Sequence, residues 1–86
     1  MRFEFDPSKS ESNKKKHGID FDEAQMLWDD LSLIEVPLFT TDEPRYLVVA
    51  KLYEKYWAGI ITYREDKIRI ISVRRARPNE VEIYES

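Results

Sequence analysis

The chain contains no cysteine, one histidine and only two glycines among its 86 residues. Without cysteine it can form neither a disulfide framework nor a zinc site built on thiolates. A single histidine argues against other zinc sites, whereas magnesium held by carboxylates alone is not excluded. We therefore expect neither disulfide bonds nor a zinc centre.

Long hydrophobic runs are also missing. No apolar stretch approaches the roughly 20 residues that a helix needs to span a bilayer. The first residues, Met1–Asp6, lack the apolar core of a secretory signal peptide. We therefore expect a soluble, cytoplasmic protein that does not contact a membrane.

What the chain does contain suffices for one folded domain. Hydrophobic residues make up 42% and aromatic residues 13% of the sequence, which argues against disorder. A chain of this length buries roughly 60–65% of the surface that its unfolded form exposes. We therefore expect residues 1–86 to form a single domain with one core.

The charges are distributed unevenly along this acidic chain of net charge −3. Lys9–His17 forms one basic cluster, and Arg64–Arg77 holds six of the 14 basic residues. The middle segment, Asp20–Glu43, is strongly acidic. This asymmetry permits an anionic ligand at one face. Tight non-specific binding of duplex nucleic acid is not expected, because it requires many neutralised phosphates.

The N-terminal residues predict a short strand and a helix. Phe3–Phe5 alternates apolar and polar side chains, as a strand does. Asp6 followed by Pro7 is typical of a helix N-cap with proline at the first helical position. The helix is expected to end at His17, because Gly18 suits the position beyond a helix C-terminus.

The remaining elements predict an α+β fold. Asp20 and Glu23 have the spacing of a capping box, which predicts a second helix to about Asp29. We then expect strands over 33–36, 45–53, 56–63 and 67–73, a turn at 54–55, and a final helix over 79–84. This order favours a small antiparallel meander with the helices packed on one face.

The basic strand within Arg64–Arg77 has two interpretations. Arginine side chains bind phosphate through two parallel hydrogen bonds, which favours an anion site. A charged edge strand that resists aggregation is the alternative. In a regular strand Arg69 and Arg75 point one way and Arg74 the other, so all line one pocket only if a bulge intervenes.

Two separated blocks carry a resemblance to a known family. The first block is Phe3-Glu-Phe-Asp-Pro-Ser-Lys9, Asn13, Lys16-His17-Gly18 and Phe21-Asp-Glu-Ala24. The second block is Arg64, Arg69-Ile-Ile-Ser-Val-Arg-Arg-Ala76, Glu80 and Tyr84. In order and spacing they resemble the N- and C-terminal signatures of BrnT-type toxins over nearly the whole chain. Where that family usually has Glu-Arg-Gly, this chain has Tyr63-Arg64-Glu65.

The resemblance implies a RelE-like fold and the toxin role in a type II toxin–antitoxin system. It implies an endoribonuclease that needs no metal or other cofactor and halts translation by cutting RNA. The implied partner is a BrnA-type antitoxin, a ribbon–helix–helix protein, in a heterotetramer of two toxins and two antitoxins. DNA would then be bound only through the antitoxin.

Metal-independent RNA cleavage requires a group that accepts the proton of the attacking 2′-hydroxyl and a donor to the leaving oxygen. His17 is the natural catalytic candidate, because its unperturbed pKa alone lies near neutrality. Capping the helix C-terminus is the alternative role for His17. Lys16 is a candidate substrate-binding residue beside it. Asn13 shares their helix face and would either orient His17 or satisfy a buried backbone group.

The arginines of the basic strand are the candidate phosphate ligands. We expect Arg64 and Arg74 to be catalytic by stabilising the charge of the transition state. Arg69 or Arg75 would bind flanking phosphates of the substrate. Tyr84 would stack on a base or donate a proton, although a tyrosine at the rim of a core is more common.

Two other functions are compatible with the residues. In the first, the fold is a catalytically weak binding module whose basic strand docks an acidic segment of the antitoxin. In the second, the chain is a structural or regulatory subunit whose acidic middle binds a basic partner. An adjacent reading frame for a ribbon–helix–helix protein would argue against this second alternative.

Overall fold

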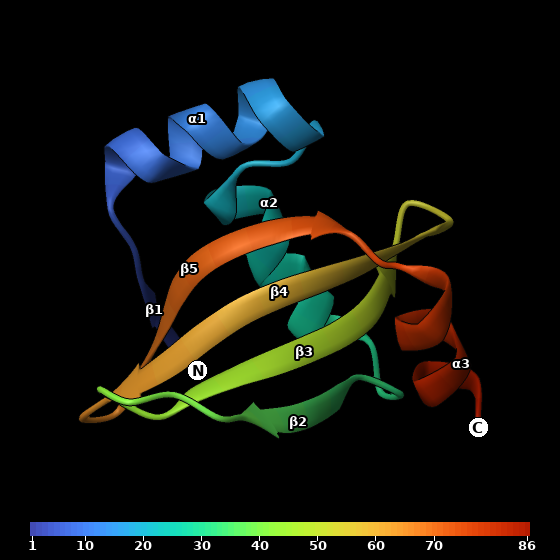
Figure 1. Ribbon diagram of the computed structural model, residues 1–86. Helices are drawn as coiled ribbons and strands as arrows, with labels where there is room; N and C mark the ends of the chain where they lie inside the picture. The colour runs from blue at the N-terminus through green and yellow to red at the C-terminus, as the bar shows by residue number, and fades with distance from the viewer.

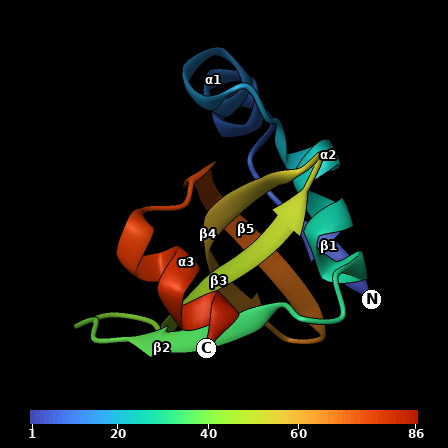
Figure 2. The ribbon, with the colours of Figure 1, turned by 90° about the vertical axis from the view of Figure 1, so that its right-hand side faces the viewer.

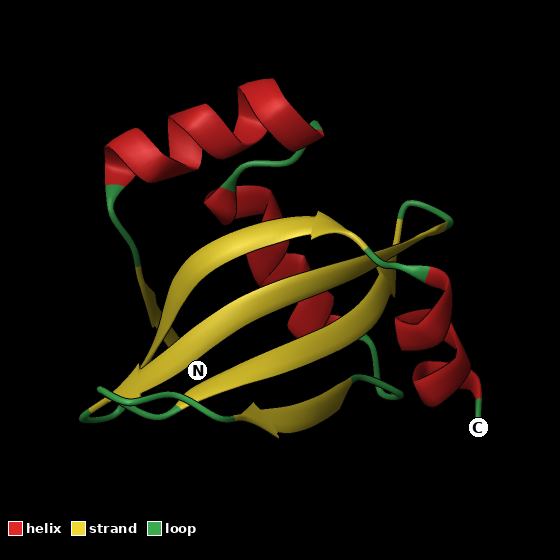
Figure 3. Ribbon diagram, in the orientation of Figure 1, coloured by secondary structure: helices red, strands yellow, loops and turns green.

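The computed structural model describes residues 1–86 and contains one sheet with helices on both sides (Figure 1). Figure 3 distinguishes the helices from the strands. The elements in chain order are β1 (Arg2–Glu4), α1 (Pro7–His17), α2 (Phe21–Ala24), the 3₁₀ helix η1 (Gln25–Asp29), β2 (Ile34–Leu38), β3 (Arg45–Leu52), β4 (Lys55–Arg64), β5 (Lys67–Arg75) and α3 (Pro78–Glu85).

The strands are arranged in the order β1-β5-β4-β3-β2. The meander predicted from the sequence is confirmed for β2 to β5, which pair antiparallel in succession. β1 differs, because it pairs parallel to β5 at the far edge. The α+β class is confirmed, and this mostly antiparallel sheet is consistent with the RelE-like fold that the resemblance implies.

The predicted ends of α1 are confirmed. The Asp6 side chain accepts a hydrogen bond from the Ser8 amide at 2.9 Å, and Pro7 occupies the first turn. Gly18 has φ 81°, a left-handed conformation that suits glycine, and its amide donates to the Lys14 carbonyl at 3.0 Å. The sequence therefore determines this helix through local interactions at both ends.

The second predicted helix is present but changes type. The capping box is confirmed, with Asp20 accepting from the Glu23 amide at 2.8 Å and Glu23 accepting from the Asp20 amide at 3.0 Å. Only the first turn, α2, is α-helical, and the chain continues as η1 to Asp29. The expectation of one α-helix to Asp29 is therefore wrong in its second half. No helix of the chain is both long and apolar enough to cross a membrane.

Several strand boundaries differ from the prediction by one or two residues. β2 continues through Pro37 to Leu38, which is possible because an edge strand can tolerate the missing amide of proline. The β3–β4 turn lies at Tyr53-Glu54, one residue earlier than expected. Both turn residues have positive φ, 56° and 61°, as a two-residue type I′ turn requires.

The two faces of the sheet carry different helices. α1, α2 and η1 cover one face, where Phe21, Leu27 and Trp57 belong to a core of 11 buried residues. α3 packs on the opposite face, where Tyr84 and Ala76 contact a smaller apolar cluster (Figure 2). The expectation that all helices share one face therefore fails for α3. The apolar side chains of the strands alternate between both faces, so each face needs a cover.

Candidate functional site

One face of the sheet is only partly covered. α3 lies over one end of it, and no helix crosses the other end (Figures 1 and 2). We call this surface of β3, β4 and β5 the open face. Its polar residues are placed by cross-strand pairing and strand alternation. They include Arg45, Thr62, Arg64, Lys67, Arg69, Ser72 and Arg74.

A β-bulge brings Arg69 and Arg74 to the same face. The β4–β5 register shifts at Ile60/Ile61, so Ile71 is an extra residue without a partner on β4. Arg69 and Arg74 are five positions apart, but their β4 partners, Thr62 and Ala58, are four apart, so both arginines lie on the open face. Regular alternation predicted opposite faces for them, and that prediction is wrong because the bulge was not visible in the strand pattern.

Arg75 lies on the other face of the sheet. It pairs across β4 with Trp57, and its guanidinium carbon lies 5.6 Å from the centre of the Trp57 ring. At this distance the cation interacts with the ring face. Regular alternation predicts Arg75 and Arg69 on the same face, and the bulge places them on opposite faces.

Arg74 is held in place by Glu80 of α3. Its two terminal nitrogens each donate to a different Glu80 carboxylate oxygen at 2.8 Å. Glu80 is only 5% exposed and also accepts from the Arg77 amide at 2.8 Å. The hydrogen bonds from Arg74 hold the pKa of Glu80 below its usual value and raise the pKa of Arg74. Arg74 is therefore a fixed cation with some exposed surface.

The other two predicted arginines of the open face also have carboxylate partners. Arg69 forms an ion pair with Glu4 of β1 at 3.0 Å, and Arg64 forms one with Glu43 at 3.5 Å. The Arg64 side chain is half exposed, so its pair contributes little to stability. Both guanidinium groups remain accessible to an anion that approaches from solvent.

Tyr84 of α3 lies at the α3 end of the open face. Tyr84 packs against the cluster that contains Ala58, and Ala58 is the β4 partner of Arg74. The Tyr84 hydroxyl donates to Asp30 at 2.7 Å, and this hydrogen bond raises the pKa of Tyr84. The hydroxyl therefore stays protonated at neutral pH, which fits a hydrogen-bond donor and not a base.

Arg64 and Arg74 lie at opposite ends of the open face. Ala58, the partner of Arg74, precedes Arg64 by six positions on β4. Six strand residues span about 20 Å. One phosphate group therefore cannot contact both side chains.

His17 and Lys16 lie at the α3 end as well, but beside the sheet. Both are exposed in the last turn of α1, which runs along β5 (Figure 1). One turn earlier, buried Asn13 exchanges hydrogen bonds with the amide and carbonyl of Val73, at 3.2 and 2.8 Å. Of the two roles considered for Asn13, the structure shows the second, since it satisfies edge groups of β5.

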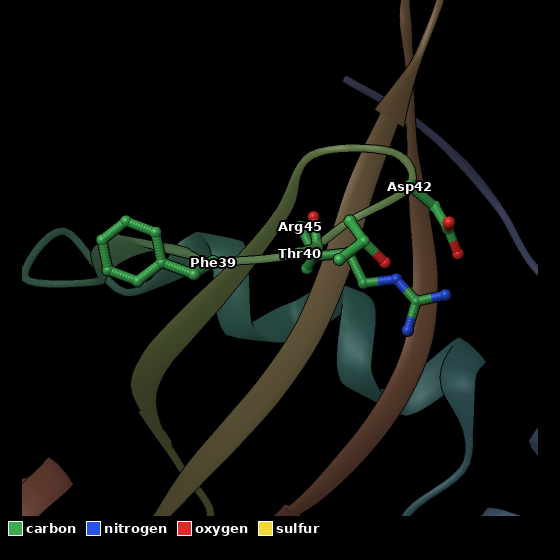
Figure 4. A pocket seen from close by; sticks show the side chains of 5 residues that line it. Phe39, Thr40, Asp42 and Arg45 are labelled. Atoms are coloured by element: carbon green, nitrogen blue, oxygen red, sulfur yellow. The ribbon is translucent and has the colours of Figure 1, made fainter.

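Arg45, the first residue of β3, was not predicted from the sequence as a site residue. Arg45 and four residues of the preceding loop line a shallow pocket, and its side chain extends from β3 across β4 (Figure 4). The available signal was its position as the first residue of the predicted strand 45–53, directly before the continuous apolar run Tyr46–Ala50. No group of three or more histidine or acidic side chains in the structure could hold a metal ion.

A family model described as the ribonuclease toxin BrnT of type II toxin–antitoxin systems matches residues 5–80. The chain belongs to this family. The match confirms the resemblance to BrnT-type toxins over most of the sequence. Among curated proteins, none matches the chain significantly.

The BrnT match sets the general function. The chain is a ribonuclease toxin of a type II toxin–antitoxin system, and such a system implies a cognate antitoxin. The matched range includes α1 with His17, all of β5 with its arginines, and Glu80. It ends before Tyr84, so the role of this tyrosine depends on its geometry alone.

Proposed function

We propose that this BrnT toxin is a metal-independent endoribonuclease that cuts single-stranded RNA along the open face. The observation that carries the proposal is the group of five basic side chains on one partly uncovered sheet face. They are Arg45, Arg64, Lys67, Arg69 and Arg74. In a ribonuclease family, a row of partly exposed cations on a sheet is suited to the phosphates of a single strand.

The cleavage centre in this proposal is the α3 end of the sheet. The 2′-hydroxyl oxygen attacks the adjacent phosphorus, a new O–P bond forms, and the bond to the 5′-oxygen breaks. His17 accepts the hydroxyl proton, and a protonated group then donates a proton to the leaving oxygen. Arg74 stabilises the added negative charge on the phosphate. Tyr84 stacks on a base, since its hydroxyl proton is already donated to Asp30.

The other predicted residues bind the flanking RNA. Arg69 and Arg64 hold phosphates farther along β5 and β4, since they lie beyond the reach of the cleaved phosphate. Lys16 and Arg75 provide positive charge beside β5 near His17. Each such contact contributes mainly through charge and is therefore sensitive to salt.

The antitoxin in this proposal is a BrnA-type protein that inhibits by covering the open face. Two toxins and two antitoxins form the complex, and DNA is bound only by the ribbon–helix–helix part of the antitoxin. One observation favours the alternative of a weak binding module. Arg64, Arg69 and Arg74 already have glutamate partners, which lowers the net charge available to RNA.

Cleavage of a labelled single-stranded RNA in the presence of EDTA tests the proposal. The wild-type protein should cut, and His17→Ala should lower the rate about 100-fold, because a proton-transfer group typically contributes 10²–10⁴-fold. His17 is exposed, so its replacement should leave the fold intact. Lys15→Ala, an exposed substitution in the same turn of α1, is the matched control and should retain the wild-type rate.

Other results separate the alternatives. Full activity of His17→Ala would remove this residue from the cleavage centre. Cleavage that requires added magnesium would contradict metal independence. Tight antitoxin binding with no RNA cleavage at high protein concentration would favour the binding module. The mass of the purified complex measures the proposed ratio of two toxins to two antitoxins.

A further inference from the structure

Arg45 differs from the other arginines of the open face. Arg64, Arg69 and Arg74 each pair with a glutamate, whereas Arg45 forms no ion pair or side-chain hydrogen bond. It is nevertheless half-buried at the start of β3. A partly desolvated cation without a carboxylate partner binds an incoming anion without first breaking an ion pair.

The position of Arg45 continues the row of cations. Alternation along β3 places Arg45 on the side of Leu47, which pairs with Ile60 of the open face. The Arg45 side chain crosses β4 in the direction of β5 (Figure 4). Arg69 lies on β5 opposite Thr62 of β4. Arg45, the arginine without an ion pair, thus lies at the end of the sheet opposite the proposed cleavage centre.

The loop that precedes Arg45 exposes an aromatic ring. Phe39 is fully exposed at 108% of its reference area, and its ring points away from the Arg45 guanidinium (Figure 4). Asp42 lines the same pocket and has no ion pair. The Thr40 hydroxyl donates to the Glu43 carbonyl at 2.6 Å, which braces the loop between them.

We infer that the 39–45 loop is a subsite for single-stranded RNA outside the cleavage centre. Arg45 binds a backbone phosphate, and the Asp42 carboxylate accepts hydrogen bonds from the amino group of the adjacent base. Phe39 stacks on the next base. An exposed aromatic ring and an unpaired cation on one segment form a combination that binds single strands through stacking and charge. The inference rests on the proposed RNA cleavage and adds where the flanking RNA is held.

Binding of a fluorescent single-stranded RNA with methylated 2′-hydroxyls tests the subsite, because this RNA cannot be cut by 2′-hydroxyl attack. Arg45→Gln, which removes the charge but keeps a polar side chain, should weaken binding about tenfold. It should also lower the slope of log K against log salt by about 0.7, the value for one lost phosphate contact. Phe39→Ala should weaken binding about tenfold without changing that slope.

Two controls match these variants. Leu31→Ala removes another fully exposed apolar side chain, 102% exposed, from the other end of β2. Lys55→Gln removes an exposed cation at the β3–β4 turn, far along β4 from Arg45. Both should bind RNA as the wild type does. Melting temperatures of all four variants exclude loss of fold, and Arg45→Lys should restore part of the affinity and the salt slope.

The possible results distinguish the subsite from the proposed function. If the wild type cuts RNA but Arg45→Gln and Phe39→Ala bind and cut as it does, the subsite is overturned and the proposed function stands. If the wild type neither binds nor cuts RNA, the proposed function fails and the subsite with it. If Phe39→Ala weakens only antitoxin binding, the loop is a protein-docking segment and the inference is overturned.

Discussion

At the scale of single residues, Glu80 is the only charged side chain that the fold buries almost completely. It fixes Arg74 through two hydrogen bonds and joins α3 to β5. Breaking a buried ion pair leaves a desolvated charge without a partner. Because Arg74 keeps 27% of its side-chain area exposed, the cost should be below that of a fully buried pair.

We predict that Glu80→Gln lowers the free energy of unfolding by about 2–3 kcal/mol at pH 7. Glu82→Gln, an exposed change on the same helix, should change it by less than about 0.5 kcal/mol. Chemical denaturation measures both. Equal stability of the two variants would contradict the structural role given to the Arg74–Glu80 pair.

The pair should also affect the dependence of stability on pH. Arg74 depresses the pKa of Glu80 in the folded state below its unfolded value near 4.5. Its contribution is therefore present above pH 4.5 and is lost as the pH falls through the folded pKa. The wild type should lose more stability than Glu80→Gln between pH 6 and about 3. Parallel pH profiles would show that the pair does not contribute in this way.

The kinds of residue at the candidate site could be predicted from the sequence, but their arrangement in space could not. The paired signatures made Arg69, Arg74 and His17 candidates, because their spacing is visible along the chain. The bulge at Ile71 depends on pairing with β4, so the faces of Arg69, Arg74 and Arg75 could not be derived from one strand. Arg45 was missed because it belongs to neither signature.

At the scale of elements, local rules predicted the helix ends, and non-local pairing caused the errors. The caps of α1 and the capping box of α2 are formed by residues at most four positions apart, so the sequence predicts them directly. The parallel β1 and the placement of α3 depend on long-range packing. The β3–β4 turn was predicted one residue too late, because Tyr53-Glu54 lacks the Asn-Gly signal for positive φ.

The attachment of α1 to β5 provides a test at this scale. Asn13 donates to the carbonyls of Ile19 and Val73 and accepts from the Val73 amide. We predict that Asn13→Asp lowers the free energy of unfolding by about 2–3 kcal/mol, because a carboxylate cannot donate to two buried carbonyls. Thermal or chemical denaturation measures the loss.

Asn79→Asp, in the exposed first turn of α3, is the matched control. It should change stability by less than about 0.5 kcal/mol, because an acidic residue is favourable near a helix N-terminus. A wild-type stability for Asn13→Asp would show that α1 is not held to β5 through this side chain. Such a result would also remove the support for the placement of His17.

At the scale of the whole molecule, the fold separates positive from negative charges, and the net charge of the chain does not reveal this separation. The chain has net charge −3, yet the open face gathers five basic side chains from three strands. The acidic middle segment supplies η1, β2 and the loop before β3. A negative total charge is therefore compatible with an RNA-binding face, since a bound strand experiences mainly the nearby charges.

The rate of RNA cleavage in EDTA by charge-matched variants tests this central claim most directly. One variant carries Arg64→Gln, Arg69→Gln and Arg74→Gln on the open face. Its control carries Lys9→Gln, Lys15→Gln and Lys55→Gln, three exposed lysines elsewhere, so both variants lose the same charge. We predict that the wild type and the control cut RNA at similar rates, and that the open-face variant is at least about 10³-fold slower. Equal rates for the two variants, or no cleavage by the wild type, would contradict the account.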